Sequence, residues 1–463
     1  MYGTVRMQEV TIENFKNVKN GIAAFQSYNK HRNKLDFDGT DIMGIYGQNG
    51  SGKTTLVEGL DLLKSILSGE KINENMKNLL TYNSETTSFK YVFIIDFSGK
   101  KFFIYYNFQL KYNTSSLKVE IIKETLKYAE IRKDSRLNTK TIIDYDIDND
   151  KNQIFTPKNI YKKIIDTDEE TNLLVAREFS KRDSTSFIFS DETEKVLQIS
   201  FNDENLYMDI IKSLKHFAKI DLFVIKNDYL GHINLNTLMP FSFMLSDNKS
   251  LKKGTVIVEL FKPSTITKET YNVLDNVITQ INIVLQSIIP GLTIEIKNLK
   301  EELMEDGEIG ITVQLLSIRD NVNIPLKFES DGIKKIISIL SALIAMYNNE
   351  KVCLVVDELD AGIFEFLLGE LLDILKSNAK GQLIFTSHNL RPLEVLDKND
   401  VIFTTTNPEN RYIRLKNVKN SNNLRDFYLR GIFLGGQDEP IYEKTKSYNI
   451  KRAFRKAGNI YEK

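Results

Sequence analysis

The sequence predicts an α/β fold in which helices cover a parallel sheet and an antiparallel β lobe lies beside it. A glycine-rich loop at residues 47–54 stands between a strand-like segment and a helical one. Residues 352–385 contain an apolar strand, a helix and a second apolar strand, whose lengths favour parallel pairing with a right-handed crossover. Three β-rich runs separated by turn residues occupy residues 89–126.

The composition is that of a globular protein with more than one domain. A length of 463 residues favours two or three domains. The 62 basic residues balance 62 acidic ones, so the net charge gives no sign of a nucleic-acid binder. The single cysteine, Cys353, excludes an internal disulfide and a cysteine-based zinc cluster. We expect a cytoplasmic protein, because the N-terminus has no apolar signal region and no window approaches the roughly 18 apolar residues of a membrane span.

The N-terminal half is predicted to form a nucleotide lobe. Residues 9–15 alternate like an edge or half-buried strand. Residues 41–46 are apolar enough for a buried strand, and residues 55–64 carry apolar side chains at helical spacing. The β-rich runs of residues 89–126 are expected to form an antiparallel meander beside the loop. The acidic stretch at residues 144–150 indicates a solvated loop where an insertion begins.

The loop at residues 47–54 matches G-x-x-x-x-G-K-[ST], the phosphate-binding pattern. Glycines let backbone N–H groups approach an anion, and the following helix directs its partly positive N-terminus at it. Lys53 is expected to reach the β- and γ-phosphates, and the Thr54 hydroxyl to ligate Mg²⁺. The alternative is a surface turn. The candidate nucleotide-binding residues of this loop are Gly47, Gln48, Asn49, Gly50, Ser51, Gly52, Lys53, Thr54 and Thr55.

The middle of the chain is weakly patterned between residues 150 and 265, apart from a predicted helix at residues 204–217. No heptads are sustained over several turns, so we expect no long coiled coil. Regular patterns return with a helix at residues 268–289 and strands at residues 292–296 and 309–316.

The C-terminal half supplies a candidate acidic centre. An apolar strand at residues 352–356 ends in Asp357 and Glu358. This order places Asp357 at the carboxyl edge of a sheet, where it can hold Mg²⁺, and leaves Glu358 to polarise the attacking water as general base. The alternative is an acidic N-cap of the following helix, predicted at residues 363–376. His388 follows the next strand, residues 383–385, and can contact the γ-phosphate; the alternative is a surface histidine.

A second anion site is predicted where an apolar helix begins at residues 332–347. Ser330 and Gly332 precede and open this helix, and a hydroxyl, a glycine amide and a helix N-terminus together favour an anion. The compatible simpler role is an N-cap at Ser330 or Asp331. The sharper hypothesis is contact with the γ-phosphate held by a second subunit.

These motifs, in this order, resemble the ABC-type ATPase heads of SMC-like proteins, RecF and the OLD (overcoming lysogenization defect) family. The likeness is greatest to the OLD-type AAA ATPases of bacterial anti-phage and abortive-infection operons. It covers residues 1 to about 125 and about 290 to 435. The segments that carry it are residues 14–16, 328–332, 356–360, 382–389 and 428–433.

The resemblance implies an ABC-type P-loop NTPase head whose two copies enclose two ATP molecules. Ser330 and Gly332 would act across that interface, and Asp360 would lie in the loop that couples the two sites. The short Ser-Asp-Gly signature argues against a transporter cassette, which carries Leu-Ser-Gly-Gly-Gln. Gln109 is only a weak candidate for the glutamine of such heads. Residues 361–364 replace the Leu-His-Pro common in relatives, so coupling there can differ.

The predicted organisation has four parts. These are an ATPase lobe at residues 1–145, an inserted mixed α/β region at 146–290, a second ATPase lobe at 291–435 and a basic tail at 436–463. The predicted catalytic residues are Lys53, Glu358, Asp360 and His388, the predicted metal ligands are Thr54 and Asp357, and the expected cofactors are ATP and Mg²⁺.

The predicted function is an ATP-driven switch that pairs as a homodimer or higher oligomer. It would control a separate effector, a nuclease or toxin, in phage defence, because no Toprim nuclease domain follows the motifs. A RecF- or SMC-like DNA clamp and a non-hydrolysing scaffold remain alternatives. DNA contact is possible at the basic cluster of residues 451–456, although such clusters are commonly solvated helix faces.

Overall fold

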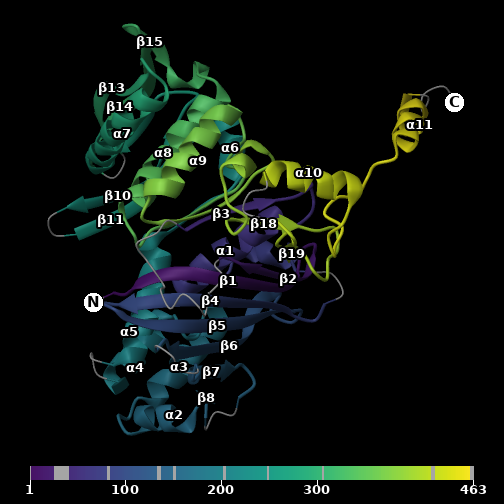
Figure 1. The fold of residues 1–463 in the computed structure, drawn as a ribbon. Helices are drawn as coiled ribbons and strands as arrows, with labels where there is room; N and C mark the ends of the chain where they lie inside the picture. Colours follow the sequence, from purple (N-terminus) through teal and green to yellow (C-terminus); the bar gives the residue numbers. More distant parts are fainter. Residues whose placement is uncertain are drawn as a thin grey trace.

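The computed structural model combines an antiparallel β lobe with a mostly parallel sheet, and the predicted α/β class is confirmed (Figure 1). The longest described helix is α7 with 21 residues, in keeping with the expectation of no long coiled coil. The structure describes residues 2–25, 41–80, 84–132, 137–149, 153–201, 205–247, 250–304, 307–418 and 423–458.

The β lobe is a seven-stranded antiparallel sheet in the order β2-β1-β4-β5-β6-β7-β8. The predicted meander is confirmed, but the solvated loop predicted from residue 144 is wrong in part. Residues 144–146 belong to β7, which pairs with β6 because Ile142, Ile143 and Tyr145 bury their side chains between the acidic ones. Asp150 lies outside the described residues. The strands are β1 (Thr4–Phe15), β2 (Val18–Ala24), β4 (Thr87–Phe97), β5 (Lys100–Asn113), β6 (Lys118–Glu130), β7 (Lys140–Asp146) and β8 (Phe155–Thr156).

Four helices pack beside the β lobe, next to β4 to β8 in Figure 1. The buried carboxylate of Glu124 joins the two layers: its oxygens accept hydrogen bonds from the hydroxyls of Tyr106 and Ser186, both at 2.6 Å, and from the backbone N–H of Phe187. The helix predicted at residues 204–217 is confirmed as α5, with Glu204 outside the described residues. The helices are α2 (Lys158–Ile165), α3 (Glu170–Asp183), α4 (Asp191–Phe201) and α5 (Leu206–His216).

The second large sheet has six strands in the order β19-β18-β3-β17-β16-β9. All neighbours in it are parallel except β18 and β19. The predicted parallel pairing of the strands at residues 352–356 and 383–385 is confirmed. Because β3 and β16 both flank β17, the segments that follow them leave the sheet at one edge. The strands are β3 (Asp41–Tyr46), β9 (Leu222–Ile225), β16 (Cys353–Val356), β17 (Gln382–Thr386), β18 (Val401–Thr404) and β19 (Tyr412–Ile413).

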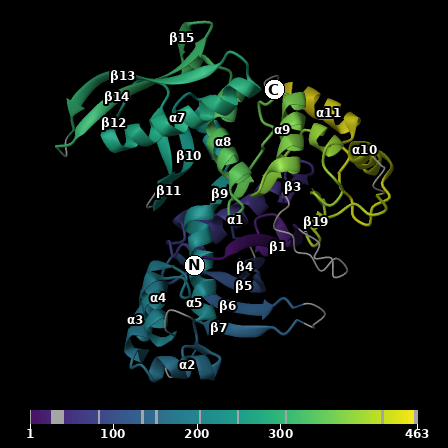
Figure 2. The same ribbon diagram turned by 60° about the vertical axis from the view of Figure 1, so that its left-hand side comes forward.

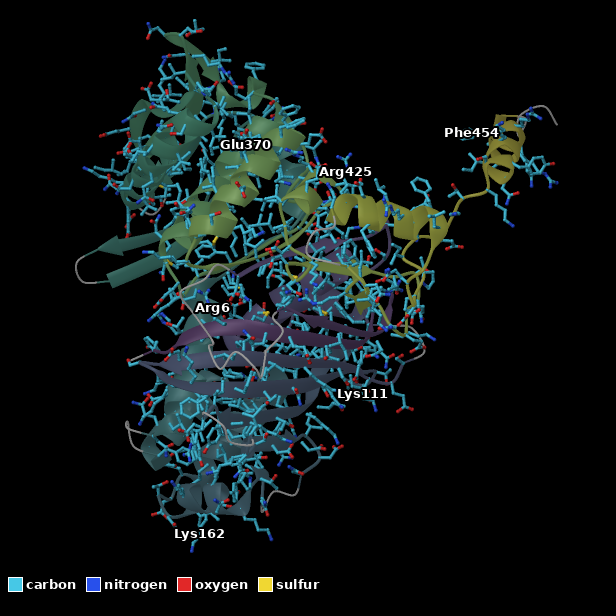
Figure 3. The ribbon with its side chains drawn as sticks, in the orientation of Figure 1. Arg6, Lys111, Lys162, Glu370, Arg425 and Phe454 are labelled. Carbon is cyan, nitrogen blue, oxygen red and sulfur yellow. The ribbon has the colours of Figure 1, made fainter. Side chains whose placement is uncertain are left out.

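Polar contacts fix β1 of the β lobe to the start of the parallel sheet. Gln382 exchanges two hydrogen bonds with the backbone of Met7, at 3.1 and 2.9 Å. Arg6, which Figure 3 labels, is 2% exposed. Its guanidinium donates to the Lys380 carbonyl at 2.5 Å and lies 3.7 Å from Asp41. Burial raises the pKa of Asp41 to about 6, against the opposing charge of Arg6.

Helices predicted around the motifs are confirmed, with ends that differ by a few residues. The phosphate loop leads into α1, and the apolar helix predicted at residues 332–347 is α8. Figure 1 shows α11 set apart from the remainder, and none of its residues is buried. These helices are α1 (Lys53–Leu67), α8 (Asp331–Asn348), α9 (Glu365–Asn378), α10 (Leu424–Leu434) and α11 (Ser447–Gly458).

A third group of elements packs beside α8, and its small sheet and α7 lie at the end of the molecule opposite α2 (Figure 2). It holds the hairpin β10–β11 and a small sheet ordered β12-β14-β13, with β15 paired to β14. The helix and strands predicted over residues 268–316 are confirmed. The elements are α6 (Asp228–Asn234), β10 (Leu238–Asp247), β11 (Ser250–Glu259), β12 (Ser264–Thr267), α7 (Lys268–Ile288), β13 (Thr293–Leu303), β14 (Ile309–Arg319) and β15 (Val322–Pro325).

The four-part domain division stays a prediction, although one observation bears on it. Strand β9 comes from the predicted insertion, residues 146–290, yet it pairs with β16 inside the six-stranded sheet. Among the described residues, no helix combines the length and the apolar character that crossing a bilayer requires. Short helical turns complete the chain at Glu74–Asn78, Phe217–Asp221, Leu326–Phe328 and Arg391–Glu394.

Candidate functional site

The phosphate loop has the backbone geometry that its glycines predict. A Cβ on Gly47 would lie 1.7 Å from the Thr404 hydroxyl oxygen, so only glycine fits. Gly50 and Gly52 have φ values of 74° and 95°, which side chains rarely adopt, and Gly52 is the N-cap of α1. The Ser51 hydroxyl donates to the Gln48 carbonyl at 2.6 Å. The loop therefore curls around the N-terminus of α1, where backbone N–H groups can meet an anion.

Lys53 is held inside this curl. Its Nζ donates to the carbonyl oxygens of Gly47 at 2.9 Å and Gln48 at 3.1 Å, and the residue is 6% exposed. Burial lowers the pKa of Lys53, while the negative charges of Asp357, Glu358 and others act to raise it. The Lys53 ammonium thus interacts electrostatically with the acidic residues that follow β16, although the two segments lie far apart in the chain.

Residues from both ends of the chain support the loop. Asn17, just after β1, accepts a 3.0 Å hydrogen bond from the Thr55 hydroxyl and donates to the Gly50 carbonyl. Arg411 donates to the Asn17 carbonyl at 2.5 Å, and the Tyr412 hydroxyl donates to the Gly52 carbonyl at 2.8 Å. Sequence reasoning missed these supports, because nothing in the spacing of the chain links residue 411 to residue 17.

Asp357 stands where β16 ends, as predicted. It is 2% exposed, and its Oδ1 accepts a 2.6 Å hydrogen bond from the Thr386 hydroxyl. Its Oδ2 is buried and has no hydrogen-bond partner among the described residues. A buried carboxylate oxygen normally has a partner, so this one fits a metal ion or a metal-bound water. Thr54, the other predicted metal ligand, is exposed and lines the cleft described below, whereas Asp357 itself does not line that cleft.

Glu358 adopts an unusual backbone conformation, with φ at 49°. Its N–H donates to the Thr386 hydroxyl at 2.7 Å, so that one hydroxyl serves both acidic residues. Its carbonyl accepts from Nζ of Lys335, a residue of α8 that is 2% exposed. Burial lowers the pKa of Lys335 to about 8, and the charges of Asp360, Glu358 and Asp357 oppose that shift. Sequence reasoning missed Lys335, although a lysine inside a strongly apolar helix was a visible signal.

Asp360 organises the turn that carries His388. Its Oδ2 accepts hydrogen bonds from the backbone N–H groups of His388 at 3.1 Å and Asn389 at 2.9 Å. Its Oδ1 is buried without a partner among the described residues. The His388 side chain is exposed and faces the same cleft as Glu358. Asp360 thus has a structural contact with His388 that the sequence did not indicate.

The two motifs meet in one cleft of about 720 Å³. Another cleft, of about 640 Å³, lies between Tyr2 and Lys351 and contains none of the motif residues. Chemistry rather than size makes the first one the candidate site. Its lining consists of Lys16, Asn17, Asn49, Gly50, Gly52, Lys53, Thr54, Thr55, Glu358 and His388.

Ser330, Gly332 and Gln109 do not line this cleft. Ser330 is exposed and caps α8, its hydroxyl accepting a 3.4 Å hydrogen bond from the Ile333 N–H. A Cβ on Gly332 would lie 1.8 Å from the Gly362 carbonyl oxygen, so the glycine allows backbones to touch. Gln109 pairs with Ser88 within the β lobe.

Comparisons with known proteins identify one matching family and several similar solved structures. A family model described as "AAA domain, putative AbiEii toxin, Type IV TA system" matches residues 42–394. No curated protein matches. A solved SMC head bound to the C-winged helix domain of ScpA is 12% identical, with 88% of this chain and 98% of that chain covered and a TM-score of 0.38. The SMC head domain from Thermotoga maritima is 12% identical, with 89% of this chain and 99% of that chain covered and a TM-score of 0.37. The recombination mediator protein RecF is 13% identical, with 83% of this chain and 93% of that chain covered and a TM-score of 0.35.

Proposed function

Because the chain belongs to the AAA domain family described as a putative AbiEii toxin of type IV TA systems, we propose that it is a Mg²⁺-dependent ATPase. The observation that carries this proposal is the shared cleft, which brings Lys53 and Thr54 of the phosphate loop to Glu358 and His388. A cation, a hydroxyl, a carboxylate and an imidazole around one cleft are the groups that phosphoryl transfer to water uses.

The residues present fit ATP and Mg²⁺. The unpartnered Oδ2 of Asp357 and the exposed hydroxyl of Thr54 would hold the metal ion, which when bound neutralises charge on the phosphate oxygens. The curl of Gly47 to Gly52 would hold the phosphates through backbone N–H groups. Lys53 would exchange its two carbonyl acceptors for phosphate oxygens.

Glu358 is the proposed general base. It lines the cleft. Its backbone N–H donates to the Thr386 hydroxyl, and its carbonyl accepts a hydrogen bond from Lys335 Nζ. Its carboxylate would take the proton of the attacking water, while His388 would orient the γ-phosphate. Asp360 would keep His388 in place through the backbone hydrogen bond already described.

ATP binding is proposed to pair two copies of the chain. Ser330 supports this, because its hydroxyl sits exposed at the N-terminus of α8 and outside its own cleft. In a pair, Ser330 and Gly332 would face the γ-phosphate bound by the other copy, and Asp360 would couple the two sites. The assembly would be a homodimer or a larger homo-oligomer.

The proposed role is control of an effector protein, a nuclease or toxin, in OLD-type phage defence. The family description, which names a toxin and a TA system, supports this context. A DNA clamp of RecF or SMC type is the second candidate, favoured by one observation: helix α11 is fully exposed and basic in its last turn. A scaffold that binds ATP without hydrolysis is the third.

Phosphate release by the purified full chain tests the proposal. We expect hydrolysis that requires Mg²⁺ and disappears in Lys53→Ala. Binding of ATP without any release would leave the scaffold in place of the enzyme. Stimulation by DNA ends would favour the clamp, whereas hydrolysis indifferent to DNA would favour effector control.

A further inference from the structure

Two consecutive lysines of α8 are almost completely buried, and they point to different partners. Lys334 and Lys335 are 1% and 2% exposed. Lys334 Nζ donates to Asn236 Oδ1 at 2.5 Å and lies 2.9 Å from Asp331. Lys335 Nζ donates to the backbone carbonyl of Glu358. Since an unpaired buried charge is very unfavourable, each lysine needs its partner. Only Lys335 has one in the acidic loop, the segment of residues 357–362 that follows β16.

The carbonyl that Lys335 contacts belongs to a residue with an unfavourable backbone. Glu358 has a φ of 49°, a region that residues with side chains seldom occupy unless the surroundings impose it. Two side chains and one backbone group hold it here; the backbone group is the Ala361 N–H, which donates to the Glu358 carbonyl at 3.0 Å. The Thr386 hydroxyl accepts from the Glu358 N–H at 2.7 Å, and the Lys335 ammonium donates to the carbonyl on the other side.

Helix α8 therefore touches the acidic loop at two points. One is the contact of Lys335 with Glu358, and the other is the backbone contact between Gly332 and Gly362. The same helix begins at the exposed Ser330 cap. A packed helix moves as a rigid unit, so a displacement at its N-terminus reaches the loop through these two contacts.

We propose that Lys335 is a positioning residue, which holds the backbone of Glu358. Through this contact, a displacement of α8 would move the Glu358 carboxylate that activates water. This inference rests on the proposed function, because there Glu358 is the general base. It adds a link within one chain: Ser330 senses the second copy, and Lys335 connects that end of α8 to the acidic loop.

The adjacent lysine provides a matched control for a test. Lys335→Met keeps the length of the side chain and removes its charge and donors, and Lys334→Met makes the same change toward other partners. We expect Lys335→Met to lower kcat roughly 10- to 100-fold with KM within about twofold, the scale on which misplacing a catalytic group acts. Lys334→Met should leave kcat within about threefold of wild type, since neither Asn236 nor Asp331 lines the cleft or belongs to the loop after β16.

A second measurement needs no nucleotide. Amide hydrogen exchange in the nucleotide-free protein should be faster over residues 358–362 in Lys335→Met than in Lys334→Met, because the loop has lost its contact with α8 through Lys335. Equal exchange in the two variants, or an equal fall in kcat, would overturn the coupling. Should Lys335→Met fail to fold, Lys335→Gln is measured in its place, with the same expected results.

A double mutant separates positioning from general damage. In a Glu358→Gln background, Lys335→Met should lower turnover by less than about twofold, because the group it positions is already absent. Full additivity would contradict the inference. If the wild type hydrolyses no ATP, the proposed function fails, and the exchange measurement alone then decides whether Lys335 anchors the loop.

Discussion

The hydroxyl of Thr386 donates to Asp357 Oδ1 at 2.6 Å and accepts the backbone N–H of the neighbouring Glu358. One side chain of β17 thereby fixes the metal-ligand candidate and the base candidate together. Thr386 itself is 0% exposed, so water cannot replace it. The geometry of the acidic centre therefore depends on a residue that carries no charge.

Thr386→Val should weaken this centre while keeping the shape of the side chain. The Asp357 oxygen and the Glu358 N–H would both lose a partner, a change on the order of 1–3 kcal/mol for each buried group. We expect a lower thermal midpoint and a higher Mg²⁺ concentration for half-maximal ATP hydrolysis. Thr386→Ser, which keeps the hydroxyl, should stay close to wild type in both.

Lys53→Ala should abolish tight ATP binding, because the loop loses the cation directed at the β- and γ-phosphates. Titration calorimetry measures the affinity directly. Lys64→Ala, on the same helix but outside the cleft lining, is the control and should bind like wild type. An unchanged affinity in Lys53→Ala would remove the nucleotide site from this cleft.

Glu358→Gln should retain ATP and lose turnover. A general base contributes roughly 10²- to 10⁴-fold, and the amide keeps the size of the side chain without its basicity. Single-turnover phosphate release and a binding titration on the same preparation separate the two quantities. Turnover that persists would assign activation of the water to another residue.

Ser330→Arg should spare nucleotide binding and prevent ATP-induced pairing. The residue is exposed at the start of α8 and does not line its own cleft. Sedimentation velocity with ATP, in the Glu358→Gln background to prevent hydrolysis, reports the pairing. A normal shift to the larger species would refute the role of Ser330 across the interface.

Folding stability should depend on pH through Asp221, which precedes β9. The residue is 3% exposed, its Oδ1 has no partner among the described residues, and Oδ2 lies 3.8 Å from His216. Burial raises the pKa of Asp221 from 3.8 to about 7, although the cations Lys351 and Lys253 act to lower it. Because the folded state holds the proton more tightly than the unfolded state, this residue contributes stability at low pH that is lost as pH rises from about 4 to about 7.

Asp221→Asn should remove that dependence. The variant is expected to gain thermal midpoint relative to wild type as the pH is raised from about 5 to about 8, by an amount that corresponds to at most a few kcal/mol. Thermal denaturation at several pH values measures it. A constant difference between the two proteins across this range would show that Asp221 does not change its charge there.

Local patterns predicted much of the site. The phosphate loop and the strand that ends in Asp357 are each formed by consecutive residues, so spacing and polarity were sufficient to predict their geometry. The acidic residues of β7 misled the prediction, because their charge concealed the alternating burial of Ile143 and Tyr145. Burial on one face of a strand decides its pairing, whatever the other face carries.

Other parts of the site could not be predicted, since they arise from contacts between distant segments. Lys335 reaches the Glu358 carbonyl only because α8 packs against the loop after β16. Arg411 and Tyr412 reach the phosphate loop because β18 and β19 extend the sheet beyond β3. Patterns within a short stretch of sequence do not show which distant segments will pair.

The way the phosphate loop is supported limits how this protein can be shortened for expression. A fragment that stopped at residue 394, where the family match ends, would contain every candidate site residue. It would lack Arg411 and Tyr412, and it would leave β3 as a bare sheet edge, because β18 pairs with it in the intact chain. The segment after residue 394 is therefore part of the smallest unit worth producing.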